Sequence, residues 1–207
     1  MAFRRPGDAC GNTIKRNKIR FRSDKAMKKT TSLQVRRLTY SAVFLAIALV
    51  LPLITGQIPE IGSMLCPMHL PVLLCGFVCG WPWGLAVGFI APLLRSAVFG
   101  MPPLFPTAVA MAFELAVYGG LAGYLYRKLP RGKGVTYVAL VLAMVAGRLV
   151  WGVVQLILTG LSGRTFTWAM FLAGAVTNAI PGIVLQLVLI PLLVLAMERA
   201  GLSLNRD

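Results

Sequence analysis

The chain has 207 residues, of which 57% are hydrophobic and only 13% are charged. A soluble domain of this length does not need that much apolar surface, so the composition argues against a soluble protein and predicts a membrane protein. The net charge of +15 would suit a nucleic-acid-binding protein. The positive charges gather in a few segments, however, as in the cytoplasmic loops of membrane proteins, and we expect no nucleic acid partner.

The N-terminal segment, residues 1–37, is basic and differs from the rest of the chain. Its first 26 residues hold eight Lys and Arg residues and almost no large aliphatic side chains, so we expect disorder there. Met27 opens MKKTTSLQVRRLTYS, a typical start for a bacterial inner-membrane protein, which suggests that translation begins at Met27. The alternative is a basic arm held on anionic lipid.

Apolar runs separated by Gly/Pro-rich or charged breaks predict six transmembrane helices in a membrane domain of residues 38–198. The runs lie at about 38–54, 69–80, 84–98, 106–126, 135–159 and 168–197. A helix needs roughly 20 residues to cross the hydrocarbon, so the second and third runs predict two short or tilted spans, with one re-entrant hairpin as the alternative. Pro181 and Pro191 are expected to kink the long last run.

The distribution of Lys and Arg predicts the orientation. Twelve of them lie in residues 1–37, four in residues 127–134 and two in the tail after residue 198, which together make 18 of the 21. Positive charge marks cytoplasmic loops, so both termini are expected in the cytoplasm, and residues 199–207 form a cytoplasmic tail. This arrangement fits an even number of spans in an all-α, six-helix membrane bundle.

Polar side chains inside the predicted spans are costly, roughly 2.5–3.5 kcal/mol for a central charge, and therefore suggest a role. Arg148, Trp151 and Gln155 share one stripe of the fifth span at spacings i, i+3 and i+7. Other spans add further polar positions, namely Gly174, Asn178, Gly182 and Gln186 on the sixth, Glu114 and Tyr118 on the fourth, Arg95 near the outer end of the third, and His69 at the start of the second. Together they predict a polar pocket facing the inside of the bundle, in its outer half.

Two interpretations of these charges stay open. Glu114 and Arg148 lie at similar depths in their spans, so they are predicted to neutralise each other inside the bundle or, alternatively, to belong to the pocket. Arg95 is the best-placed cation for an anionic group, and Arg148 is the alternative if Glu114 points elsewhere. His69 is expected to be a hydrogen-bonded structural residue more than a ligand of the substrate.

The sequence lacks the residues of a catalytic or metal site. Cys75 and Cys79 share a helix face, but no His or acid stands at metal-ligand spacing, and we expect no metal and no cofactor. His69 is the only histidine, no Asp lies in a predicted span, and no G-x-x-x-x-G-K phosphate loop occurs. The chain is therefore not expected to be an enzyme.

The two outer connections and the first span carry further signals. Residues 55–68 and 99–106 are rich in Gly, Pro, Met and aromatic residues rather than in charge, so they are expected to fold over the pocket as an apolar lid. In the first span Ala42 and Ala46 are spaced i and i+4, and such small residues let another helix approach closely.

These features together resemble the substrate-binding S components of energy-coupling factor (ECF) vitamin transporters, from about Met27 to Leu202. The stretches GQIPEIGSMLCPMHLPVLLCGFVCGW, PLLRSAVFGMPPLFPTAVAMAFELAVYG and NAIPGIVLQLVLIPLLVLAMERA are most similar to the pantothenate-type S components. The resemblance implies a subunit of the bacterial cytoplasmic membrane that captures a vitamin, with Ala42 and Ala46 docking onto a transmembrane coupling protein. Two cytoplasmic ATPases would supply the energy.

The substrate-binding residues expected from position are Arg95, Arg148, Asn178, Gln155, Trp151, Glu114 and His69. Pantothenate would offer one carboxylate to Arg95 or Arg148, and hydroxyl and amide groups to the polar residues around them. The alternative function is a stand-alone membrane facilitator or channel for a small polar solute.

Overall fold

The computed structural model describes residues 7–55, 66–130, 132, 134–163, 167–175 and 179–205. It divides into two units, Met1–Leu38 and Thr39–Asp207. The first helix, α1 (Gly7–Thr55), begins in the first unit and ends in the second. Lys and Arg are good helix formers, which suits the helical conformation of this basic segment, but a helix without packing is marginal in water. The disorder expected for residues 1–37 therefore stays a prediction.

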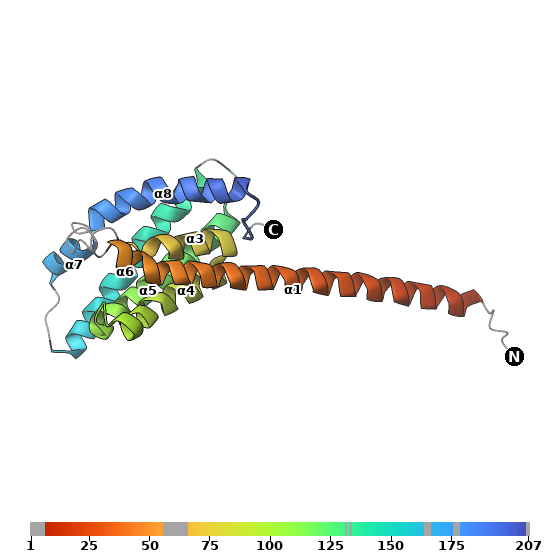
Figure 1. Ribbon diagram of the computed structural model, residues 1–207, viewed down its shortest axis with the longest axis horizontal. Coiled ribbons are helices and arrows are strands. Elements are labelled where there is room, and N and C mark those ends of the chain that lie inside the picture. Colours follow the sequence, from red (N-terminus) through yellow and green to blue (C-terminus); the bar gives the residue numbers. More distant parts are fainter. Residues whose placement is uncertain are drawn as a thin grey trace. The chain divides into compact units, whose positions relative to one another are not determined.

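The second unit is a bundle of apolar helices (Figure 1), and every regular element among the described residues is helical. After α1 come α3 (His69–Cys79), α4 (Trp81–Phe99), the π-helical turn η1 (Leu104–Ala108), α5 (Val109–Lys128), α6 (Val135–Leu161), α7 (Trp168–Ala175) and α8 (Ile180–Arg199). The predicted all-α class is confirmed in this part of the chain.

Five helical stretches among the described residues are long and apolar enough to cross a membrane. They are Thr30–Ile54, Trp81–Phe99, Leu104–Lys128, Val135–Leu161 and Ile180–Arg199. They correspond to five of the six predicted runs, so the polytopic membrane character is confirmed. Helix α3 has only 11 residues, too few to cross alone. The number of six spans and the orientation stay predictions.

The last predicted run, residues 168–197, contains two described helices, α7 up to Ala175 and α8 from Ile180. Residues 176–178 lie outside the described residues, so the single kinked span stays a prediction. Pro181 lies in the first turn of α8. There its missing N–H removes no intrahelical hydrogen bond, which is why proline favours a helix start.

Helix α5 occupies the centre of the bundle and packs against α3, α4 and α6. Small residues make the closest approach possible. A Cβ atom added at Gly76, Gly84 or Gly119 would overlap the backbone of the facing helix. These three glycines therefore bring α3, α4 and α5 into backbone contact, as small residues do at helix interfaces in membranes.

After α8 the chain turns back onto the end of α3. The Leu204 N–H donates to the Val78 carbonyl oxygen at 2.8 Å. The buried Asn205 side chain donates through Nδ2 to the carbonyl oxygens of Gly123, at 3.0 Å, and Gly76, at 3.4 Å. The tail after α8 is therefore hydrogen-bonded to the C-terminal parts of α3 and α5. In the predicted orientation these parts face the cytoplasm.

We expect Asn205→Ala to lower the free energy of unfolding by about 1–2 kcal/mol, the net contribution of two such hydrogen bonds. Thermal melting of the purified protein in detergent measures the change. Ser203→Ala, two residues away in the same tail, is the matched control and should change the stability by less than about 0.5 kcal/mol. Equal melting temperatures of the two variants would show that the tail does not stabilise the bundle.

Candidate functional site

A buried ion pair joins the two central helices. Arg148 of α6 places Nη1 3.0 Å from Oε1 of Glu114 on α5, and the Glu114 side chain is only 2% exposed. The expectation that these two side chains meet is confirmed. Because α5 and α6 pack against each other, the pair neutralises both charges where water is scarce.

His69 and Tyr118 complete the surroundings of this carboxylate. His69 Nε2 lies 3.5 Å from Glu114 Oε1, and the histidine side chain is 3% exposed. Its ring is tilted by 60° against the ring of Tyr118, with 5.2 Å between the centroids. His69 and Glu114 are thus brought together with Arg148, as expected for members of one polar seam.

Arg148 has a second partner, which lies in the connection before α3. Its Nη2 donates to Sγ of Cys66 at 3.7 Å. Burial raises the pKa of the Cys66 thiol, against the opposing influence of the Arg148 charge, so that Cys66 faces the guanidinium as a neutral thiol. A thiol is a weak hydrogen-bond acceptor, so this contact leaves much of the hydrogen-bonding capacity of Arg148 unused.

Several polar atoms of this cluster are buried without a hydrogen-bond partner in the described part of the chain. They are Arg148 Nε, the Tyr118 hydroxyl, both ring nitrogens of His69 and Oε1 of Glu114, the atom that forms the ion pair. Buried polar groups nearly always have a partner, and exceptions call for a functional explanation or an unseen ligand. Arg148 and Tyr118 are therefore candidates to bind an acceptor group of a small molecule.

A cavity of about 320 Å³ lies beside these two residues, between α5, α6, α7 and α8. Arg148 and Tyr118 are its polar lining residues, and the rest of its wall is apolar: Val141, Met144, Val145, Leu149, Phe171, Ile183 and Leu187. A mostly apolar wall with few polar groups is typical of small-molecule sites, and the volume lies at the lower end of their range.

The structure does not place Arg95 in this cluster. Its Nη1 donates to the Leu49 carbonyl oxygen of α1 at 2.8 Å, and its guanidinium lies 5.5 Å from the centroid of the Phe99 ring. Arg95 is also not among the residues that line the cavity. Its predicted role toward a substrate stays a prediction, whereas Arg148 now has the better-defined site.

The remaining predicted residues lie at different places. The Trp151 ring stacks on Phe171 of α7 at 6.3 Å between centroids and 29° between planes. The Gln155 side-chain oxygen is buried without a hydrogen-bond partner in the described part of the chain. Gln155 follows Arg148 by two helical turns, roughly 10 Å along α6. Asn178 lies outside the described residues.

Sequence reasoning did not assign Cys66 or Phe171 to the pocket. It placed Tyr118 among the polar positions of the pocket, four residues after Glu114, but did not name it as a substrate-binding residue. Cys66 is 82 residues away from Arg148 along the chain, and no periodicity connects the two positions. Phe171 reads in the sequence as one more apolar residue of a membrane helix.

The comparison with known families decides the class of the protein. A family model described as "ECF transporter, substrate-specific component" matches residues 36–194, most of the chain. The chain belongs to this S component family. The family is a transporter family and not an enzyme family, and within the described residues no group of three or more metal-ligating side chains could hold a metal ion.

The family match assigns the protein a biological role. An S component is a membrane protein that belongs to an ECF transporter and determines its substrate. No curated protein and no solved structure matches the chain. The matching family names no vitamin, so the identity of the substrate has to be argued from the site of this S component.

Proposed function

We propose that this S component captures a small water-soluble vitamin at the outer face of the bacterial cytoplasmic membrane, and that the vitamin is pantothenate. The coupling protein and the two ATPases of an ECF module would complete the importer. The observation that carries the proposal is the family match over residues 36–194. The cavity beside Arg148 and Tyr118 supports a site for a small ligand between α5, α6, α7 and α8.

The charged and polar lining of the cavity suits a small ligand with one carboxylate and a hydrogen-bonding group beside it. Arg148 contacts Glu114 through Nη1, while its Nε has no hydrogen-bond partner in the described part of the chain. A carboxylate that binds Nε gains a charge-assisted hydrogen bond in an apolar setting. Pantothenate has one carboxylate, and its hydroxyl and amide groups suit the Tyr118 hydroxyl and the amide of Gln155. Asn178 and His69 are proposed as further partners, and Arg95 as the alternative cation.

The proposed orientation, with both termini in the cytoplasm, places this site in the outer half of the bundle. Glu114 lies five residues, roughly 8 Å, from the start of α5 at Val109, and this start faces outward in that orientation. The apolar side chains of Met101, Leu104 and Phe105 before α5 are 63%, 56% and 52% exposed. They are available to fold over the site as a lid. The other proposed lid segment, residues 56–65, lies outside the described residues.

The surface of α1 supports the proposed docking of the coupling protein. Ala42 and Ala46 are exposed, whereas Ser41, Phe44 and Ala48 on another side of the helix are buried. The two alanines thus form an outward-facing pair of small residues, the kind of surface that a second membrane helix can approach closely.

Titration calorimetry of the purified protein in detergent tests the proposal. We expect pantothenate to bind, and riboflavin, thiamine, pyridoxine and niacin to bind much more weakly or not at all. Pantothenol, which replaces the carboxylate by an alcohol, should bind roughly 10- to 150-fold more weakly than pantothenate, because it loses a hydrogen bond to a charged group. Tight binding of another vitamin would overturn the choice of pantothenate. If none of them binds, a stand-alone facilitator becomes the better interpretation.

Paired variants then identify the cation. Glu114→Gln keeps Arg148 and frees it from its ion pair, so pantothenate binding should be retained or strengthened. Adding Arg148→Met to this variant removes the cation without leaving an unpaired buried carboxylate, and binding should be lost. Retained binding in the double variant together with loss in Arg95→Gln would identify Arg95 as the partner of the carboxylate.

A further inference from the structure

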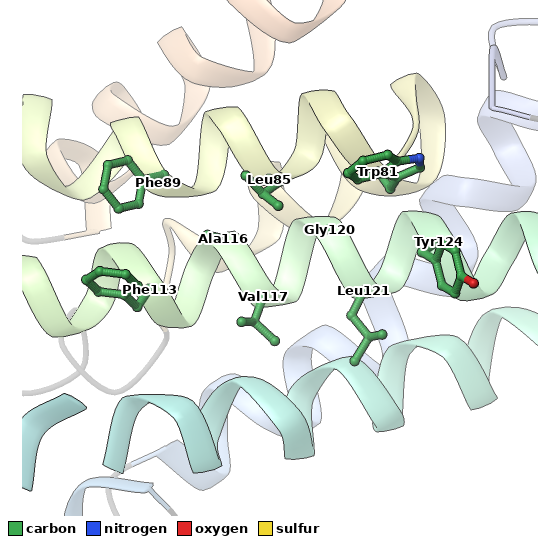
Figure 2. A pocket seen from close by; sticks show the side chains of 9 residues that line it. All are labelled: Trp81, Leu85, Phe89, Phe113, Ala116, Val117, Gly120, Leu121 and Tyr124. Carbon is green, nitrogen blue, oxygen red and sulfur yellow. The ribbon is translucent and has the colours of Figure 1, made fainter. Parts of the chain in front are cut away.

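An apolar groove of about 630 Å³ runs along the outside of the bundle between α4 and α5, apart from the cavity beside Arg148 and Tyr118. Figure 2 shows its walls: Trp81, Leu85 and Phe89 from α4, and Phe113, Val117, Leu121 and Tyr124 from α5. Ala116 and Gly120 complete the lining. The large side chains of the walls, such as Trp81, Leu85 and Tyr124, are more than 40% exposed, so the groove faces the surroundings of the protein.

The two ends of this α4–α5 groove differ. At one end Phe89 and Phe113 meet edge to face, with 5.6 Å between their centroids. At the other end lie Trp81 and Tyr124 (Figure 2). Trp and Tyr concentrate at the boundary between hydrocarbon and lipid headgroups. The Trp81–Tyr124 end is therefore expected at the headgroup level, and the Phe89–Phe113 end near the middle of the membrane.

The headgroup end also carries positive charge. Lys128 places Nζ 5.9 Å from the centroid of the Tyr124 ring. Lys128 and Arg127 follow Tyr124 by four and three residues, which puts both on the helix face of the groove, and both are exposed. The nearby acid, Glu198, accepts a hydrogen bond from Tyr126, whose buried ring packs on Phe77 of α3 and not on the groove.

The length of the groove matches one lipid tail. From Trp81 to Phe89 the helix rises roughly 12 Å, and one leaflet contributes about 15 Å of hydrocarbon, half of the core. A single acyl chain lying along the small residues Ala116 and Gly120 would reach from the headgroup level to the Phe89–Phe113 contact. The basic residues would then meet an anionic headgroup and not a neutral one.

We propose that the α4–α5 groove binds an anionic phospholipid, with one acyl chain along the groove and the phosphate headgroup beside Arg127 and Lys128. The inference is independent of the vitamin and of its cavity. A lipid is a better occupant than a partner helix, because the groove has about the length of a lipid tail, Trp and Tyr side chains at one end only, and positive charge at that same end.

Native mass spectrometry of the full-length protein tests this proposal with an equimolar mixture of dioleoylphosphatidylglycerol and dioleoylphosphatidylcholine. We expect the wild-type protein to retain phosphatidylglycerol in preference. Replacing both Arg127 and Lys128 by Gln should reduce the retained phosphatidylglycerol about fivefold for each basic residue removed. Arg199→Gln, which removes one exposed positive charge in the last turn of α8, is the control and should change it much less than either Arg127→Gln or Lys128→Gln alone.

A second pair of variants tests the groove itself. Val117→Trp fills the groove from its α5 wall, and we expect the retained lipid to fall several-fold while the melting temperature stays close to that of the wild type. Val188→Trp adds the same bulk at an exposed position of α8 and should leave the lipid in place. Equal retention of the two lipids by the wild type would overturn the headgroup assignment, and equal behaviour of the two tryptophan variants would overturn the groove.

Discussion

Glu114→Gln is expected to lower the free energy of unfolding by about 3–5 kcal/mol, because it leaves the Arg148 guanidinium partly buried without its counter-charge. The Arg148 side chain is 15% exposed, so some solvation reduces this cost toward the lower figure. Arg148→Met leaves the more deeply buried Glu114 carboxylate unpaired and should cost at least as much. Denaturant titration in mixed micelles, followed by circular dichroism, measures both changes.

The double variant Glu114→Gln/Arg148→Met distinguishes an ion pair from other causes. It removes both charges and retains similar side-chain volumes, so it should recover most of the lost stability, as replacements of whole buried ion pairs often do. A double variant as unstable as the sum of the two single variants would show that the residues stabilise the bundle independently of each other. The electrostatic account of the pair would then be wrong.

Gly119→Ala is expected to cost about 3 kcal/mol or more, at the upper end of the range for overpacking. The added Cβ would overlap the carbonyl group of Gly84 on the neighbouring helix. These are backbone atoms, which cannot rotate aside as a side chain does, so α4 and α5 would have to separate. Thermal melting in detergent measures the loss of stability.

Gly120→Ala, at the next residue, is the matched control. There the added Cβ meets only side-chain atoms of Leu85, the nearest at 3.4 Å. Alanine is also the better helix former, by about 1 kcal/mol, so this variant should be neutral or slightly stabilising. If both variants melt at the same temperature, the close approach of α4 and α5 at Gly119 does not limit stability.

The helical class and the Glu114–Arg148 contact follow from local signals in the sequence. Apolar runs identify membrane helices because lipid requires them, and two opposite charges at matching depth in neighbouring spans have strong reasons to pair. The same reasoning could not find the partners of Arg95. Its hydrogen bond to the Leu49 carbonyl oxygen joins positions 46 residues apart, and a backbone acceptor leaves no mark in the sequence.

Helix rotation and helix breaks were equally hard to predict. In a membrane protein both the lipid-facing and the protein-facing side of a helix are apolar, so hydropathy does not separate them as it does in a soluble protein. The cavity wall that contains Val141 and Ile183 therefore resembles any other part of its helices. Pro181 lies in the first turn of α8, and proline occurs both at helix starts and at kinks, so its presence in a sequence does not distinguish the two.

Helix α3 has a consequence for how the protein is made. All of its 11 residues are buried, and at roughly 16 Å it is about half as long as the hydrocarbon is thick. Alone in a bilayer it would leave polar groups at its ends without water or partners. Its neighbour α5 emerges from the ribosome later than α3. The segment around α3 therefore reaches its final position only when α5 arrives, and membrane insertion of this region is coupled to folding instead of preceding it.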